Sequence, residues 1–159
     1  MPRFRRAGSA LVTDGNVGDQ RVAIVKPQTF MNRSGTALGP LIREPGFDIS
    51  SHMLVIVDDY AIALGTMRFR ARGSSGGHNG LQSIEDAVGS PEYHRLRIGV
   101  GPIPEGDIDP AEFVLSPFTA SESQTMTELM PVLVGAVDCW ILEGIETAMN
   151  KFNQRTGEG

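Results

Sequence analysis

Residues 66–89 read TMRFRARGSSGGHNGLQSIEDAVG, a stretch that predicts a strand, a glycine-rich loop and a helix in succession. In Thr66–Arg72, arginines alternate with apolar residues, which predicts a strand with one charged face and one apolar face. From Leu81 to Val88, apolar residues recur at helical spacing, and Gly89 then ends the helix. A strand that leads through a loop into a helix is typical of an α/β domain.

The loop between them, RGSSGGHNG, spans Arg72–Gly80. Its glycines leave backbone N–H groups open to a close ligand, and its end leads into a helix N-terminus, which favours anions or a carbonyl oxygen. The loop has neither the G-K-[ST] of a Walker loop nor the G-x-G-x-x-G spacing, so nucleotide binding is weakly supported. His78 has two interpretations: a hydrogen-bonded helix cap or a residue that contacts a ligand.

The rest of the chain continues the alternation. Strands are predicted at 21–25 and 53–57, both as buried strands, at 95–100, and briefly at 113–115. Helices are predicted at 34–44, with Ser34 as its cap, and from Thr119 to Phe152, where Pro131 predicts a kink. We therefore expect an α/β fold: a three-layer αβα single domain over residues 1–159, with a mixed, mostly parallel sheet and a flexible tail at 153–159.

Composition narrows the class of protein. The chain has 159 residues, 40% of them hydrophobic, and no unbroken apolar run approaches a membrane span of about 18–20 residues. The single cysteine, Cys139, excludes an internal disulfide and is expected to be a buried, inert thiol. A net charge of −5 argues against nonspecific coating of nucleic acid, but it leaves room for a local basic patch. A cytoplasmic protein is expected.

Several polar residues are candidates for a site. Asp58 and Asp59 end an apolar run, either as a solvated pair or with one of them orienting a histidine or a water for proton transfer. Asn32 stands before a predicted helix, either as a cap or as an amide that holds a carbonyl and a water. No metal-ligand cluster is evident, and His52 and His94 are expected to be ordinary surface or interface residues.

Four arginines alternate along the two strands next to the glycine loop: Arg68, Arg70, Arg95 and Arg97. One interpretation is a solvated sheet face. The favoured one is a track for nucleic-acid phosphates, because guanidinium groups bind phosphate oxygens in a matching planar geometry.

Together these stretches resemble the bacterial-type peptidyl-tRNA hydrolase family. KPQTFMNRSG (Lys26–Gly35), the longer stretch Leu54–Ile84, and EYHRLRIGVGPIP (Glu92–Pro104) match the family's signatures in order and spacing. The combination of GGHNGL with RLRIGVG is highly specific to this family. The resemblance runs from about Arg21 to the final helix.

The resemblance implies hydrolysis of the ester between a peptide and the 3′ end of tRNA, by a monomer without a metal or organic cofactor and without a membrane. It implies that Asp58 orients the histidine base, and that Asn32 and Asn79 hold the water and the peptide. It implies further that Met31 and His78 line the peptide channel. Arg70 and Arg97 fall on the positions that clamp tRNA phosphate, and residues 101–110 correspond to a mobile rim.

The sequence departs from the family before Arg21. The family begins with a strand, a GLGNPG-like turn and a TRHN segment whose histidine is the general base, and nothing similar precedes Arg21 here. We therefore expect that the first strand, one asparagine and the base are absent. Loss of the base by itself lowers the rate by about 10²–10⁴-fold. The alternative functions are a catalytically impaired tRNA- or RNA-binding paralogue and a truncated gene product.

Overall fold

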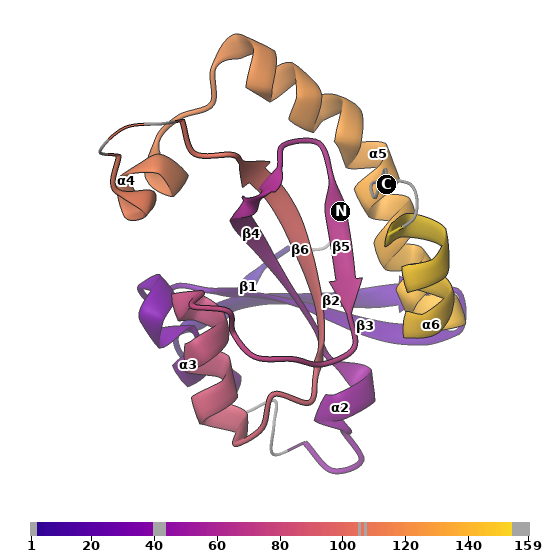
Figure 1. Cartoon of the computed structure of the whole chain (residues 1–159). Helices are drawn as coiled ribbons and strands as arrows, with labels where there is room; N and C mark the ends of the chain where they lie inside the picture. The colour runs from indigo at the N-terminus through magenta and orange to yellow at the C-terminus, as the bar shows by residue number, and fades with distance from the viewer. Residues whose placement is uncertain (1–2, 40–43, 105, 107, 154–159) are drawn as a thin grey trace. The chain divides into compact units, whose positions relative to one another are not determined.

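The computed structural model describes residues 3–39, 44–104, 106 and 108–153. Its contacts divide the chain into two compact units. The first unit contains the residues up to Leu54 together with Arg72–His94, and the second contains Val55–Ala71 together with the residues from Arg95 onward. Figure 1 labels the strands and α-helices of both.

The first unit contains a three-stranded antiparallel sheet. β1 (Arg5–Ala7), β2 (Ala10–Val17) and β3 (Gln20–Pro27) pair in sequence order (Figure 1). The tight turn between β2 and β3 begins at Gly18, whose φ of 58° is the left-handed conformation that such a hairpin requires. Of these strands, the sequence patterns predict only β3. β3 was also expected to be buried, but it is an edge strand, and Ile24 is 54% exposed.

Two helical segments of the first unit pack against each other. η1 is a 3-10 helix (Met31–Leu38), and α3 (Asn79–Val88) follows the glycine loop; α2 (Ile49–His52) is a single short turn. The backbone N–H of Gly35 donates to Ser83 Oγ at 2.8 Å. A Cβ at Gly35 would overlap the backbone carbonyl oxygen of Ser83, so this close packing requires glycine.

The helix predicted at 34–44 therefore begins earlier than expected. Ser34 lies inside η1, and its hydroxyl donates to the carbonyl of Met31 at 2.8 Å instead of capping an N–H group. Residues 40–43 of the predicted helix lie outside the described residues. The prediction of α3 is confirmed, including its end at Gly89, which has a φ of 79°.

The second unit contains a second sheet, in the order β4-β6-β5. β4 spans Leu54–Ala63, β5 spans Met67–Arg70 and β6 spans His94–Gly101, with β5 antiparallel to β6. The predicted alternation in β5 is confirmed, because Met67 and Phe69 are buried whereas the arginines between and after them are exposed. β4 was expected to be covered on both faces. It lies at the edge of the sheet instead, and Ile56 is 49% exposed.

Helices follow β6 to the end of the described chain: α4 (Pro110–Leu115), α5 (Ala120–Glu143), α6 (Ile145–Ala148) and the π-helix η2 (Met149–Asn153). α6 and η2 pack against β5, and α5 packs against α6 (Figure 1). The predicted capping box of Thr119 and Glu122 is confirmed. α5 passes through Pro131 as one helix, but it ends at Gly144 and not at Phe152.

Two predictions for this part of the chain are wrong. Residues 113–115 are helical, because Pro110 suits a first helical turn and the N–H of Phe113 donates to the carbonyl of Asp109 at 3.0 Å. Asn153 is not part of a flexible tail, since its amide makes two hydrogen bonds to the backbone of Phe69 in β5. Residues 154–159 lie outside the described part of the chain.

α5 is also long and apolar enough to cross a membrane, with a mean hydropathy of 1.4. The expectation concerned apolar runs, whereas α5 meets the criterion by averaged hydropathy, which tolerates the polar residues that interrupt such a run. Core helices of globular proteins meet the same criterion, and α5 has a buried stripe of that kind, formed by Leu129, Leu133, Ala136 and Cys139.

Candidate active site

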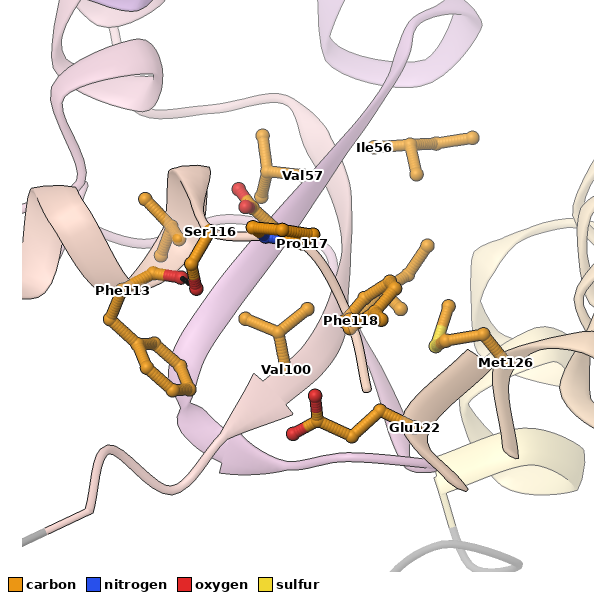
Figure 2. Close-up of a pocket in the computed structure, with 12 residues that line it drawn as sticks. Ile56, Val57, Val100, Phe113, Ser116, Pro117, Phe118, Glu122 and Met126 are labelled. Carbon is orange, nitrogen blue, oxygen red and sulfur yellow. Dashed lines mark hydrogen bonds between the residues drawn. The ribbon is translucent and has the colours of Figure 1, made fainter. Parts of the chain in front are cut away.

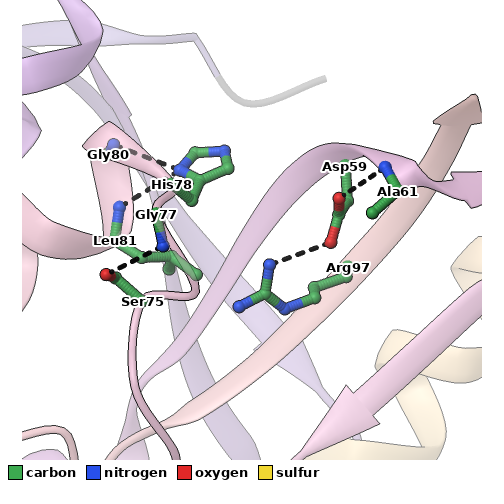
Figure 3. A network of polar contacts seen from close by, with 8 residues as sticks. All are labelled: Asp59, Ala61, Ser75, Gly77, His78, Gly80, Leu81 and Arg97. Atoms are coloured by element: carbon green, nitrogen blue, oxygen red, sulfur yellow. Dashed lines mark hydrogen bonds and ion pairs between the residues drawn. The ribbon is translucent and has the colours of Figure 1, made fainter. Parts of the chain in front are cut away.

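The glycine loop of the first unit ends in a helix cap made by a histidine. His78 Nδ1 accepts hydrogen bonds from the backbone N–H groups of Gly80, at 3.1 Å, and Leu81, at 3.2 Å (Figure 3). These contacts satisfy two of the N–H groups that a helix N-terminus leaves unpaired. Because Nδ1 accepts, the neutral ring carries its proton on Nε2. His78 is thus a helix cap, as one of its two interpretations predicted, and the two hydrogen bonds fix the orientation of its ring.

Glycine at position 80 lets two of the predicted residues approach each other. A Cβ at Gly80 would stand 2.6 Å from Met31 Sδ and 3.0 Å from His78 Cε1. No side chain larger than hydrogen fits there without moving one of the two. The structure therefore brings Met31 and His78 together at the N-terminus of α3, as the resemblance implies for residues that line one channel.

The two asparagines lie at the starts of the two helical segments of this unit. Asn79 is the first residue of α3, and it is exposed. Asn32 is in η1, but its side chain lies outside the part that the structure describes. At the start of η1, a hollow of about 290 Å³ is lined by Gln28, Thr29, Phe30 and Arg33.

Asp58 is in the second unit and lines its own pocket. This pocket has a volume of about 400 Å³ (Figure 2). Its walls come from β4, β6, α4 and the beginning of α5, and they are formed by Ile56, Val57, Asp58, Ile98, Val100, Phe113, Val114, Ser116, Pro117, Phe118, Glu122 and Met126. Most of these side chains are apolar. Asp58 is half-buried beside this largely apolar surface.

Asp59, the next residue, is engaged in an ion pair. Its Oδ2 lies 2.9 Å from Arg97 Nη1, and its Oδ1 accepts a hydrogen bond from the N–H of Ala61 at 2.8 Å (Figure 3). The two side chains of the pair are only 13% and 16% exposed. Of the two adjacent aspartates, Asp58 thus lines the pocket while Asp59 holds an arginine.

The strand pairing brings the four arginines together. Arg68 lies opposite Arg97, and Arg70 lies opposite Arg95, in the antiparallel pairing of β5 with β6. Arg68 and Arg70 are exposed, whereas the Arg97 side chain is 16% exposed and pairs with Asp59. Arg95 is only 1% exposed, so the prediction that it joins an exposed track is wrong: on β6 it is part of the interior.

The other two histidines, His52 and His94, differ in exposure. His94 was expected at the surface or an interface; at 8% exposed, it is not a surface residue. His52 is exposed, and its Nδ1 accepts from the backbone N–H of Asp48 at 2.9 Å. Within the described ranges, no group of three or more His, Cys, Asp or Glu side chains could hold a metal ion.

The sequence patterns missed four contributors to these sites. Gly80 was noted only as part of a bare loop, although its lack of a side chain is what allows the approach of Met31. Asp59 was weighed together with Asp58, as a solvated pair or as a residue of proton transfer, and its pairing with Arg97 joins residues 38 positions apart. Phe113, which was expected in a brief strand, and Phe118, for which no role was expected, also line the Asp58 pocket.

These features define an α/β protein with a helix-terminal glycine loop and a carboxylate in an apolar pocket. Comparisons with known proteins then identify its family. The sequence model of the peptidyl-tRNA hydrolase family matches residues 2–158, so the chain belongs to the peptidyl-tRNA hydrolase family.

Individual relatives agree with this assignment. A peptidyl-tRNA hydrolase of Gemmatimonas aurantiaca is 41% identical over 155 residues, covering 95% of this chain and 80% of that protein. One of Chloroflexus aggregans is 42% identical over 151 residues, covering 95% and 79%. The crystal structure of peptidyl-tRNA hydrolase from Acinetobacter baumannii matches with a TM-score of 0.83 and 26% identity, covering 94% and 76%. The predicted α/β fold with a mixed sheet and the predicted class of enzyme, a hydrolase of translation, are confirmed.

Proposed function

We propose that this chain hydrolyses the ester bond between a peptide and the 3′ end of tRNA, with Asp58 as the carboxylate that orients the reacting groups. The observation that carries the proposal is the position of Asp58 in an apolar pocket of about 400 Å³. A carboxylate in such surroundings can hold an imidazole in the orientation in which it removes a proton from water.

In the first unit, we assign the binding of the peptide to the N-terminus of α3 and the start of η1. His78, fixed by its capping bonds, presents an Nε2–H donor of the kind that binds a peptide carbonyl. Met31 supplies apolar surface next to that ring. Asn79 and Asn32 add amides that both donate and accept. These contacts favour backbone recognition, which suits peptides of any sequence.

Binding of the tRNA is assigned to the arginines of the second unit. Arg70 is exposed on β5, and Arg97 lies on β6 within the same cluster. Guanidinium groups bind phosphate oxygens with two parallel hydrogen bonds, which gives both affinity and orientation. A monomer, a cytoplasmic location and the absence of a cofactor or membrane partner stay predictions, as does a single domain.

The general base stays a prediction as well. The resemblance puts the base on a histidine that none of His52, His78 and His94 matches, and His78 Nδ1 and His52 Nδ1 each accept a backbone hydrogen bond. The second candidate function is binding of tRNA without turnover, which the arginines of the second unit would support.

The test is release of labelled N-acetyl-amino acid from N-acetyl-aminoacyl-tRNA by the purified chain. We expect Asp58→Asn to lower kcat by about 10²–10⁴-fold, because the orientation of the proton acceptor is lost. The matched control is Asp14→Asn, which removes an aspartate that pairs with Arg5 and Arg21 at 3.8 and 3.6 Å on β2. The control should behave as wild type.

Two results would decide against this function. An unchanged kcat in Asp58→Asn would remove Asp58 from the chemistry. Binding of tRNA with no release of the amino acid by the wild-type chain would establish the second candidate in place of the first.

A further inference from the structure

Arg97 is placed opposite another cation. The register of β5 and β6 sets Arg97 directly across from Arg68. Like charges in directly opposed positions on a sheet repel each other. Without a compensating anion, the guanidinium of Arg97 would be displaced away from its neighbour, and a long side chain of this kind has many rotamers available.

Asp59 supplies the compensating anion with a fixed geometry. Its Oδ2 is 2.9 Å from Arg97 Nη1, and its other oxygen accepts from the N–H of Ala61 at 2.8 Å. The second bond ties the carboxylate to the backbone of its own strand (Figure 3). The guanidinium is therefore held through Asp59 to β4, in addition to its own attachment to β6.

The pair is largely shielded from solvent. The side chains of Arg97 and Asp59 are 16% and 13% exposed. A shielded ion pair is screened much less by dissolved salt than one on the surface, so it persists at the ionic strength of a cell. By contrast, the pairs of Asp14 with Arg5 and Arg21 are formed by side chains with exposures between 38% and 83%.

We propose that Asp59 is a positioning residue for tRNA binding, which holds the Arg97 guanidinium where it meets a phosphate of the acceptor end. This inference rests on the proposed function of Arg97. It adds a role for the second aspartate of the Asp58–Asp59 pair: Asp58 serves the reaction, while Asp59 serves recognition through Arg97 and does not touch the substrate.

The experiment measures Kd for uncharged tRNA across a range of salt concentrations, together with kcat and KM for N-acetyl-aminoacyl-tRNA. We expect Asp59→Asn to raise Kd and KM by about five- to tenfold, because the guanidinium loses its fixed position. We also expect it to lower the slope of log Kd against log salt by about one phosphate contact, as Arg97→Ala does. kcat should change less than twofold.

The double variant Asp59→Asn/Arg97→Ala isolates the coupling. If Asp59 acts through Arg97, the double variant binds tRNA as weakly as Arg97→Ala alone and no more weakly. Asp14→Asn is the control for removing an aspartate that pairs with arginine. If Asp59→Asn is too unstable to assay, Asp59→Glu carries the same test, because it keeps the charge but moves the carboxylate by one methylene.

Several results would overturn the positioning role while leaving the proposed function intact. The first is an unchanged Kd in Asp59→Asn beside a raised Kd in Arg97→Ala. The second is additive effects on Kd in the double variant. The third is tighter binding of tRNA by Asp59→Asn, which would mean that Asp59 merely repels phosphate. Failure of the wild-type chain to bind tRNA would instead contradict the proposed function, and the positioning role would fall with it.

Discussion

His78 serves as the N-cap of α3 through a ring nitrogen, and this role is separable from any contact with substrate. We expect His78→Ala to lower the free energy of unfolding by about 1 kcal/mol, because two backbone N–H groups lose their acceptor. His78→Asn keeps a side-chain acceptor and should cost less. Urea denaturation of the three proteins measures the difference, and equal losses in both variants would contradict the capping role.

Cys139 is buried in the stripe of α5 that faces the interior. Burial, and secondarily the charge of Glu143, raises the pKa of the thiol above its ordinary value of 9.0. A raised thiol pKa favours the protonated form in the folded state. Its contribution to stability is therefore complete below the unfolded-state pKa, and it is lost as the pH rises through the higher folded-state pKa.

Cys139 should accordingly react slowly with iodoacetamide at pH 8.5 in the folded protein and quickly in urea. The rate of alkylation, followed by mass spectrometry, measures this. A Cys139→Ala variant should also lose less stability than wild type between pH 9 and pH 11. Rapid alkylation of the folded protein would show that the thiol is accessible.

At the scale of elements, one side chain secures the strand that carries Arg68 and Arg70. Asn153 Oδ1 accepts from the N–H of Phe69 at 2.7 Å, and Asn153 Nδ2 donates to the carbonyl of Phe69 at 3.0 Å. The amide thus bonds to β5 as a neighbouring strand would. The rings of Phe69 and Phe152 also meet edge to face, with centroids 6.4 Å apart, which adds apolar contact between η2 and β5.

We expect Asn153→Ala to reduce the free energy of unfolding by about 2 kcal/mol, because it leaves two backbone groups of β5 without these partners. The amide of Phe69 should then exchange with deuterium faster than in wild type. Asn150→Ala, at an exposed position of the same π-helix, is the matched control. If both variants exchange alike, Asn153 does not secure the strand.

At the scale of the whole molecule, the proposed binding of tRNA to a chain with a net charge of −5 requires a local cluster of arginines. We expect tRNA binding to weaken steeply with salt in spite of the net charge, since released counterions set the slope. Arg70→Ala should reduce the slope of log Kd against log salt by about one. Lys151→Ala, which removes an exposed lysine 3.4 Å from Glu143, should leave it unchanged. Equal slopes for wild type and Arg70→Ala would exclude Arg70 from the phosphate contacts.

Local patterns predicted those elements whose character depends on near neighbours. The alternation in β5, the spacing and glycine stop of α3, and the capping box of α5 are all visible within a few residues, and the structure has them. Patterns failed where the same residues suit two structures. Residues 113–115 are apolar enough for a strand, but Pro110 starts a helix there.

Burial was the second source of error. Continuous apolar runs predicted buried strands at 21–25 and 53–57, yet β3 and β4 are edge strands of their sheets. Arg95 was expected on an exposed sheet face and His94 at the surface or an interface, yet both are buried. Position in a sheet is a property of strand order, which a single run of residues does not encode.

The sequence by itself determined the family, through motifs such as GGHNGL and RLRIGVG, and with the family the expected chemistry of Asp58, His78 and Asn79. Only the tertiary structure decided that Asp59 holds Arg97 and that Asn153 secures Phe69. These pairs are 38 and 84 positions apart in the chain. Periodicity reports which neighbours share a face, whereas hydrogen bonds and ion pairs between distant residues depend on the register of strands and on the packing of helices against them.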